Sequence, residues 1–145
     1  MMISNPGPTI SAVDVSAFEA ELGAQLPVAY REFLLRYNGG CPTPDIVDVP
    51  DASGSPTDLQ VFFGLGRTEK TSDLSWNLSL IRKRCPTLLV LPVACDSGGN
   101  LFCLTLKQRV ASDVVYCDLE DPNYLLYPVA SSFTGLLDKL RSFGH

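Results

Sequence analysis

The chain has 145 residues, of which 46% are hydrophobic and 19% are charged, so its composition excludes a disordered protein and fits one globular domain. A chain of this length buries roughly 70% of its unfolded surface, and neither disulfides nor metal ions are needed to hold its core. The formal net charge of -5 argues against nucleic acid as a partner, because that partner needs a basic surface, and favours a basic protein.

The cysteines and the apolar stretches predict a cytoplasmic protein that crosses no membrane. The five cysteines include no C-x-x-C pair, so they lack the spacing of a structural zinc site and predict free thiols in a reducing compartment. The first residues, MMISNPGPTI, have neither the basic nor the long apolar region of a secretory signal. The longest apolar stretch, LLVLPVAC, is too short for a bilayer. We expect no metal and no cofactor.

The beginning of the chain predicts a lead-in and two helices. Residues 1–10 contain two prolines and no periodicity, which predicts a flexible lead-in, so the folded domain should span residues 11–145. Apolar residues at helical spacing predict a first helix between a cap at Ser11 and a stop at Gly23. In LPVAYREFLLRYNGG the proline suits the first helical position and the final Asn-Gly-Gly suits a helix stop.

The middle of the chain predicts a loop, a strand and a third helix. The segment after residue 40 is rich in proline, aspartate and glycine, and predicts mostly loop with a short strand at Ile46–Val49. Aromatic and β-branched residues in LQVFFGLG predict a strand. A leucine stripe then predicts a helix that is capped by Thr71 or Ser72 and stops before Pro86.

The last part of the chain predicts a sheet and a final helix. Three apolar segments, TLLVLPVAC, LFCLTLK and DVVYCDLE, predict strands joined by hairpins. Pro92 cannot donate a ladder hydrogen bond, so it should mark an edge or a bulge. YLLYPVA predicts a short edge strand, and SSFTGLLDKLRSFG has helical spacing as far as Phe143. The fold class is therefore α+β, with a mixed, mainly antiparallel sheet and flanking helices in a single domain.

The stretch VACDSGGN, residues 93–100, joins two of the predicted strands and looks like the loop of an active site. It is not a phosphate-binding P-loop, because it lacks G-K-[ST] and a strand follows it. It is not a nucleophile elbow either, because it lacks G-x-S-x-G. Its two glycines predict a tight hairpin turn, and such a turn can still lie on a binding surface.

Few groups in the chain are candidates for catalysis. The single histidine, His145, lies at the C-terminal end, where we expect a frayed terminus and no base for a serine or cysteine nucleophile. Asp96 and the pair Glu120–Asp121 follow apolar strands and are candidates for acid–base chemistry, although carboxylates in turns commonly bind the backbone. We predict no catalytic residues, and an enzyme that uses the Asp96 loop is the competing hypothesis.

Three segments resemble, in the right order, the motifs of the SUKH superfamily of Smi/Knr-type domains. LGAQLPVAYREFLLRYNGGCP (residues 22–42) is similar to its opening L-G-x-x-L-P-x-x-Y-x-x-F-L with N-G-G and proline. LLVLPVACDSGGNLFCLTL (88–106) resembles its central strand, acidic Gly-Gly-Asn turn and following strand, and VVYCDLED (114–121) resembles the next strand. Val28 stands where the family often has aspartate, and Cys117 where it commonly has an aromatic residue, so the subfamily stays open.

The resemblance implies an α+β binding domain without catalysis. Many bacterial members of the superfamily resemble immunity proteins, which bind and neutralise a cognate polymorphic or contact-dependent toxin in the cytoplasm. This resemblance favours a toxin domain as the protein partner, and the acidic charge favours a basic one such as a nuclease. Eukaryotic members resemble regulators of cell-wall synthesis and signalling. The alternative is therefore a scaffold or regulatory module with a host protein partner.

The candidate partner-binding surface combines polar residues of the predicted loops with one tryptophan. Carboxylates of the acid-rich loop suit a basic partner, and Trp76 lies off the leucine stripe of its helix, as an interface aromatic would. The alternatives are a solvated loop and a half-buried tryptophan. The candidate residues are Asp45, Asp48, Asp51, Asp58, Trp76, Asp96, Asn100, Glu120 and Asp121.

Overall fold

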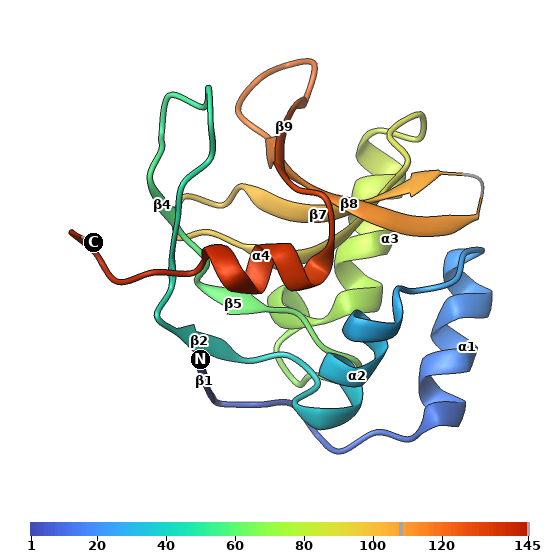
Figure 1. Cartoon of the computed structure of the whole chain (residues 1–145). Helices are drawn as coiled ribbons and strands as arrows, with labels where there is room; N and C mark the ends of the chain where they lie inside the picture. Colours follow the sequence, from blue (N-terminus) through green and yellow to red (C-terminus); the bar gives the residue numbers. More distant parts are fainter. Residues whose placement is uncertain (108, 145) are drawn as a thin grey trace.

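The computed structural model describes residues 1–107 and 109–144, and within them the chain forms an α+β domain (Figure 1). The main sheet has five antiparallel strands in the order β5-β6-β7-β8-β9. Two small antiparallel sheets pair β1 with β2 and β3 with β4. The predicted fold class is confirmed, and among the described residues parallel pairing occurs at isolated bridges such as Gln25 with Val110. The frayed end predicted at His145 lies outside the described residues.

The helices are α1 (Ala12–Leu22), α2 (Val28–Arg36), the 3-10 helix η1 (Lys70–Ser72), α3 (Leu74–Arg84) and α4 (Phe133–Lys139). The short strands are β1 (Met2–Ser4), β2 (Cys41–Thr43), β3 (Ile46–Val47), β4 (Thr57–Asp58) and β5 (Val61–Phe62). The long strands are β6 (Val90–Cys95), β7 (Leu101–Lys107), β8 (Val110–Asp118) and β9 (Leu125–Ala130). Among the described residues, no helix combines the length and the apolar character needed to cross a membrane.

The ends of α1 follow the predicted caps. The side chain of Ser11 accepts a hydrogen bond from the backbone N–H of Asp14, and the Asp14 carboxylate accepts one from the Ser11 N–H at 2.8 Å. Gly23 ends the helix with φ 79°, a conformation that costs glycine little. For α2, Pro27 is the N-cap and not the first helical residue, because its ψ of 145° is extended.

The other two long helices differ from the predictions at one end each. The cap of α3 is Asp73, whose carboxylate accepts a hydrogen bond from the Trp76 N–H at 3.0 Å. The predicted caps, Thr71 and Ser72, instead lie in the 3-10 helix η1. The last helix stops at Lys139, four residues before Phe143, because the backbone of Arg141 pairs with that of Ile46. Phe143 is 78% exposed, so it adds nothing to the apolar face of α4.

The N-terminal segment also differs from the prediction. Met2–Ser4 forms the strand β1, which pairs with Cys41–Thr43, where the sequence predicted a loose lead-in. A strand of three residues is too short to leave a periodic pattern in the sequence. Its partner lies about forty positions away, and the pairing closes the first part of the chain onto the domain.

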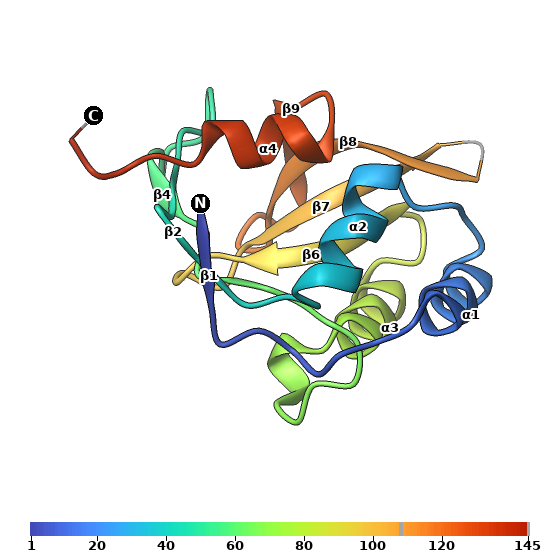
Figure 2. The same ribbon diagram turned by 60° about the horizontal axis from the view of Figure 1, so that its bottom comes forward.

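The main sheet is covered on both faces, and Figure 2 shows α2 and α4 on one side of it and α3 on the other. On the first side the ring of Phe133 packs edge-on against those of Tyr30, Phe33 and Phe62 at centroid distances of 4.8 to 5.9 Å. Pro92 lies in the interior strand β6 at a shift of register, which confirms a bulge and not an edge.

Candidate functional site

The turn between β6 and β7 is built around the carboxylate of Asp96, which is only 4% exposed. This carboxylate accepts hydrogen bonds from the hydroxyl of Thr57 at 2.9 Å, from the backbone N–H of Asn100 at 2.8 Å and from the hydroxyl of Tyr116. Gly99 completes the turn with φ 88°. The predicted hairpin turn is confirmed, and Asp96 lies inside it.

Asn100 and Asp58 connect this turn to two other loops. Asn100 donates from Nδ2 to the Tyr116 hydroxyl at 2.9 Å and accepts at Oδ1 from the backbone N–H of Leu119 at 3.0 Å. Asp58 accepts from both the backbone N–H, at 2.8 Å, and the hydroxyl of Ser97. These contacts fix strand β4 and the β8–β9 loop to the turn. We call this set the turn junction; its residues are Thr57, Asp58, Asp96, Ser97, Asn100 and Tyr116.

Tyr116 in the turn junction and Cys95 beside it both have raised pKa values. Burial raises the pKa of Tyr116, and its hydrogen bond to Asp96 raises that pKa further. Burial, followed by the charges of Asp96 and Asp58, raises the pKa of the Cys95 thiol to about 11. Cys95 therefore stays protonated at neutral pH, and a thiol nucleophile is not available at this position.

A hydrophobic groove lies next to the turn junction, between α3 and the sheet. We call it the α3 groove; its volume is about 230 Å³ and its lining residues are Phe63, Thr71, Trp76, Asn77, Leu80, Ile81, Arg84, Cys95, Gly99, Leu101 and Leu119. Trp76 is 37% exposed, so part of its indole ring faces solvent. Apart from Arg84, the lining side chains are uncharged.

The spacing of residues along α3 explains how one helix serves both the core and the groove. Leu74, Leu78 and Ile81 are buried against the domain. Trp76, Leu80 and Arg84 follow each other at intervals of four, which places them along one adjacent stripe of the helix. This second stripe is a sequence signal for the groove, and the leucine stripe alone does not reveal it. Leu119, on the opposite wall, carries no such signal.

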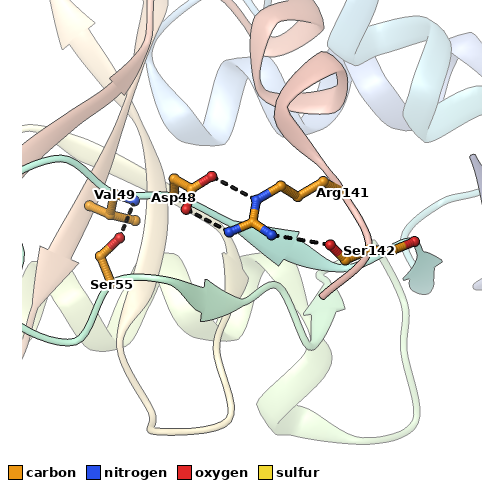
Figure 3. A network of polar contacts seen from close by, with 5 residues as sticks. All are labelled: Asp48, Val49, Ser55, Arg141 and Ser142. Atoms are coloured by element: carbon orange, nitrogen blue, oxygen red, sulfur yellow. Dashed lines mark hydrogen bonds and ion pairs between the residues drawn. The ribbon is translucent and has the colours of Figure 1, made fainter. Parts of the chain in front are cut away.

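The acid-rich segment, residues 45–58, is fixed to the C-terminal end of the chain. Figure 3 shows the guanidinium of Arg141 on the carboxylate of Asp48, with Nε and Nη2 each 2.8 Å from one oxygen. The hydrogen bond from Arg141 is the main cause that lowers the pKa of Asp48. In the same segment the Ser55 hydroxyl accepts from the backbone N–H of Val49 at 2.9 Å. Asp48 is therefore engaged in a structural ion pair.

The other predicted carboxylates are more accessible. Asp51 is exposed and has φ 70°, which aspartate tolerates in a turn. Asp45 is half-buried in the same segment. In the β8–β9 loop Glu120 is exposed, whereas Asp121 accepts from the backbone N–H of Asn123 at 2.8 Å. These side chains give the loops negative charge without forming one cluster.

The structure thus brings together only part of the predicted surface. Asp58, Asp96 and Asn100 meet in the turn junction. Trp76 lines the α3 groove together with Gly99 and Leu119, which lie next to the turn junction. Asp48 is held elsewhere by Arg141. Within residues 1–107 and 109–144, no three His, Cys, Asp or Glu residues are placed to hold a metal ion.

All five cysteines are free thiols. Cys103 is fully buried in β7, and burial raises its pKa well above the ordinary value. Burial, followed by the charge of Asp118, raises the pKa of Cys117 to about 11. These two thiols pack as small apolar groups in the sheet.

Comparison with known proteins agrees with this fold and with the sequence motifs. A search of curated proteins finds no match to this chain. The sequence model of the SMI1 / KNR4 family (SUKH-1) matches residues 9–139, which include all four α-helices and the whole main sheet. Because the match covers nearly the entire chain, the protein belongs to the SMI1 / KNR4 family (SUKH-1).

Proposed function

We propose that this protein is a non-catalytic binding module that acts as an immunity protein in the cytoplasm. It neutralises a cognate polymorphic or contact-dependent toxin by direct contact. The observation that carries the proposal is the α3 groove with a partly exposed tryptophan at its edge. Large aromatic side chains that become fully desolvated when an interface forms supply much of its binding energy. Membership of the SMI1 / KNR4 family (SUKH-1) supports the same role.

The state of Asp96 supports binding over catalysis. A general acid or base must be free to exchange a proton with a substrate. The Asp96 carboxylate instead accepts three hydrogen bonds inside the turn and is nearly inaccessible. Its role is to shape the surface on which the partner lies, and Asn100 shares that role.

The charge of the chain supports a basic partner such as a nuclease toxin. The net charge is -5, and Asp51 and Glu120 are exposed on loops. An acidic protein that covers the basic active face of a nuclease would associate quickly and compete with nucleic acid for that face. Within the acid-rich segment, Asp51 is the residue best placed to contribute, because Asp48 and Asp58 already hold structural partners.

Co-expression with the toxin domain encoded by the neighbouring gene tests this function. We expect the wild-type protein to restore growth of cells that produce the toxin and to co-purify with it, with affinity that falls as salt rises. Trp76→Ala and Asp51→Lys should weaken the complex, whereas Glu32→Lys, which changes an exposed acid on α2, should not. An affinity that stays constant or rises as salt is added would contradict the proposal that the acidic charge attracts a basic partner.

The same experiment separates the competing functions. A stable complex with a host regulatory protein, and none with the toxin domain, would favour the scaffold function. Hydrolytic activity in the wild type that disappears in folded Asp96→Ala and Asn100→Ala variants would overturn the non-catalytic assignment. Wild-type growth rescue without a detectable complex would also contradict neutralisation by direct binding.

A further inference from the structure

We propose that the α3 groove receives one large apolar side chain of the partner together with a carboxylate next to it in the partner sequence. This inference rests on the proposed function, because it describes how a protein partner is recognised. It assigns the partner a short segment in which an aromatic or leucine residue stands next to an aspartate or glutamate. Four features of the groove carry it: its size, its lining, its rigidity and its charge.

The size and lining of the groove suit a side chain. Pockets that hold drug-sized ligands have volumes of about 300–1,000 Å³. The α3 groove is smaller, about 230 Å³, so it accommodates one large side chain better than a complete cofactor. Its lining includes the apolar side chains of Phe63, Leu80, Leu101 and Leu119, which come from different parts of the fold. Burying an aromatic or leucine side chain there would supply a favourable transfer free energy.

Both walls of the groove are held in place before a partner arrives. On the helix side, Asn77 Nδ2 donates to the backbone oxygens of Thr71 and Asp73 at 3.2 and 2.9 Å, which fixes the first turn beside Trp76. On the sheet side, the bond from the Leu119 N–H to Asn100 holds the β8–β9 loop against the turn. A preformed hollow loses little conformational entropy on binding.

The positive charge at the groove is the reason for expecting a carboxylate in the partner. Arg84 is the charged residue in the lining, and within the described part of the chain its guanidinium forms no ion pair. Its neighbour Arg82 is occupied, because it donates to the backbone oxygens of Glu21 and Leu22. Lys83 adds exposed positive charge to the same turn. A guanidinium with free donors binds a carboxylate in a bidentate manner.

Four-residue peptides provide a direct test on the intact protein. The probe is acetyl-Gly-Phe-Glu-Gly-amide, and two matched controls replace glutamate with glutamine or phenylalanine with alanine. Trp76 is the only tryptophan of the chain, so its fluorescence reports binding at the groove. We expect the Phe-Glu peptide to shift the emission, the Phe-Gln peptide to bind about fivefold more weakly, and the Ala-Glu peptide to give no shift at millimolar concentration.

Two substitutions in one helical turn test the assignment of Arg84. Arg84→Gln should remove the preference for glutamate over glutamine, while Lys83→Gln, which changes an exposed cation outside the groove, should keep it. Thermal unfolding of both variants checks that they fold, and exposed positions of this kind change stability little. Equal affinity of the wild type for the two phenylalanine peptides would overturn the proposal, as would equal effects of the two substitutions.

The test is independent of the toxin experiment. If the peptides fail to bind while the toxin complex forms, this inference is wrong and the proposed function stands. If the peptides bind as expected while no toxin complex forms, the groove is a binding site for another protein. Sedimentation of the wild type alone gives a third result, because a dimer that Trp76→Ala abolishes would assign the groove to a second copy of the chain and overturn the proposal.

Discussion

The hydroxyl group of Tyr116 donates a hydrogen bond to the carboxylate of Asp96, and this contact joins strand β8 to the turn that follows β6. Tyr116 also accepts from Asn100, so one phenol group links both ends of the turn. The ring of Tyr116 packs edge-on against that of Phe102, with 5.2 Å between the ring centroids, and this packing fixes the position of the hydroxyl group. The surface beside the α3 groove therefore depends on a polar network that is itself part of the core.

Removing this hydroxyl should destabilise the protein measurably. Tyr116→Phe leaves the buried carboxylate of Asp96 without one donor, so we expect the free energy of unfolding to fall by about 1–3 kcal/mol. Urea denaturation measures the loss. Tyr127→Phe, on the neighbouring strand β9, is the matched control and should stay within about 0.5 kcal/mol of the wild type. A loss of similar size in both variants would show that the network contributes no specific stability.

Asn38 is a second buried polar residue whose side chain holds distant segments together. It is 1% exposed, and its amide donates to the backbone oxygens of Pro8 and Leu65 at 2.9 and 2.8 Å while accepting from the Leu65 N–H at 2.7 Å. Its φ of 51° lies in the left-handed region. The Asn-Gly-Gly stop of α2 therefore also connects the N-terminal segment to the turn at Leu65 that follows β5.

Substitution of Asn38 should be among the most destabilising polar changes in the chain. Asn38→Ala removes three buried hydrogen bonds and also strains the backbone, so we expect a loss of about 3 kcal/mol or more in thermal or urea unfolding. Asn38→Gly relieves the backbone strain and isolates the contribution of the side chain. Asn123→Ala, at an exposed position, serves as the reference. Equal stability of Asn38→Gly and the wild type would contradict the role of the amide.

The sequence predicted the parts of the fold that depend on local patterns. The apolar stripe that includes Val15 and Phe18 predicted α1, and the alternation of strands and turns predicted the antiparallel sheet. Pro92 predicted either an edge or a bulge, because a missing N–H donor is a local chemical property, and the fold decides in favour of the bulge. The strand β1 and the end of α4 could not be predicted in this way, because both depend on pairing with residues far along the chain.

The candidate site shows the same division. Trp76 and Asp96 were found by residue type, but their environments were set by tertiary contacts. Asp96 proved to be buried because Thr57 and Tyr116, from other strands, reach its carboxylate. The opposite wall of the groove, at Leu119, comes from a loop that is placed by Asn100. Sequence patterns identify such residues singly, whereas only the fold determines which of them share a surface.

The cysteines provide a test of core packing through their chemical reactivity. Cys103 is fully buried with a strongly raised pKa, so it should resist alkylation by iodoacetamide in the native protein at pH 8. Peptide mapping by mass spectrometry should find this residue modified only after unfolding in urea. Cys41 and Cys85 are half-buried and should react earlier, which makes them the internal reference. Rapid native labelling of Cys103 would contradict the packing of β7.

The ion pair between Asp48 and Arg141 predicts a specific dependence of stability on acidity. Arg141 lowers the pKa of Asp48 below its ordinary value of 3.8 in the folded state. A carboxyl group with a depressed folded pKa contributes stability above its unfolded pKa, and this contribution is lost as the pH falls through the folded pKa. The pair should therefore stabilise the fold at neutral pH and cease to do so in strong acid.

The difference in melting temperature between the wild type and Asp48→Asn measures this contribution. We expect the wild type to melt higher at pH 7, and the difference to shrink between about pH 5 and pH 2 as Asp48 takes up a proton. Because the pair is solvent-exposed, added salt should also reduce the difference at pH 7. Asp51→Asn, in the same segment but without a cation partner among the described contacts, is the control and should show no such trend. A difference for Asp48→Asn that persists unchanged at pH 2 would show that the ion pair with Arg141 is not its source.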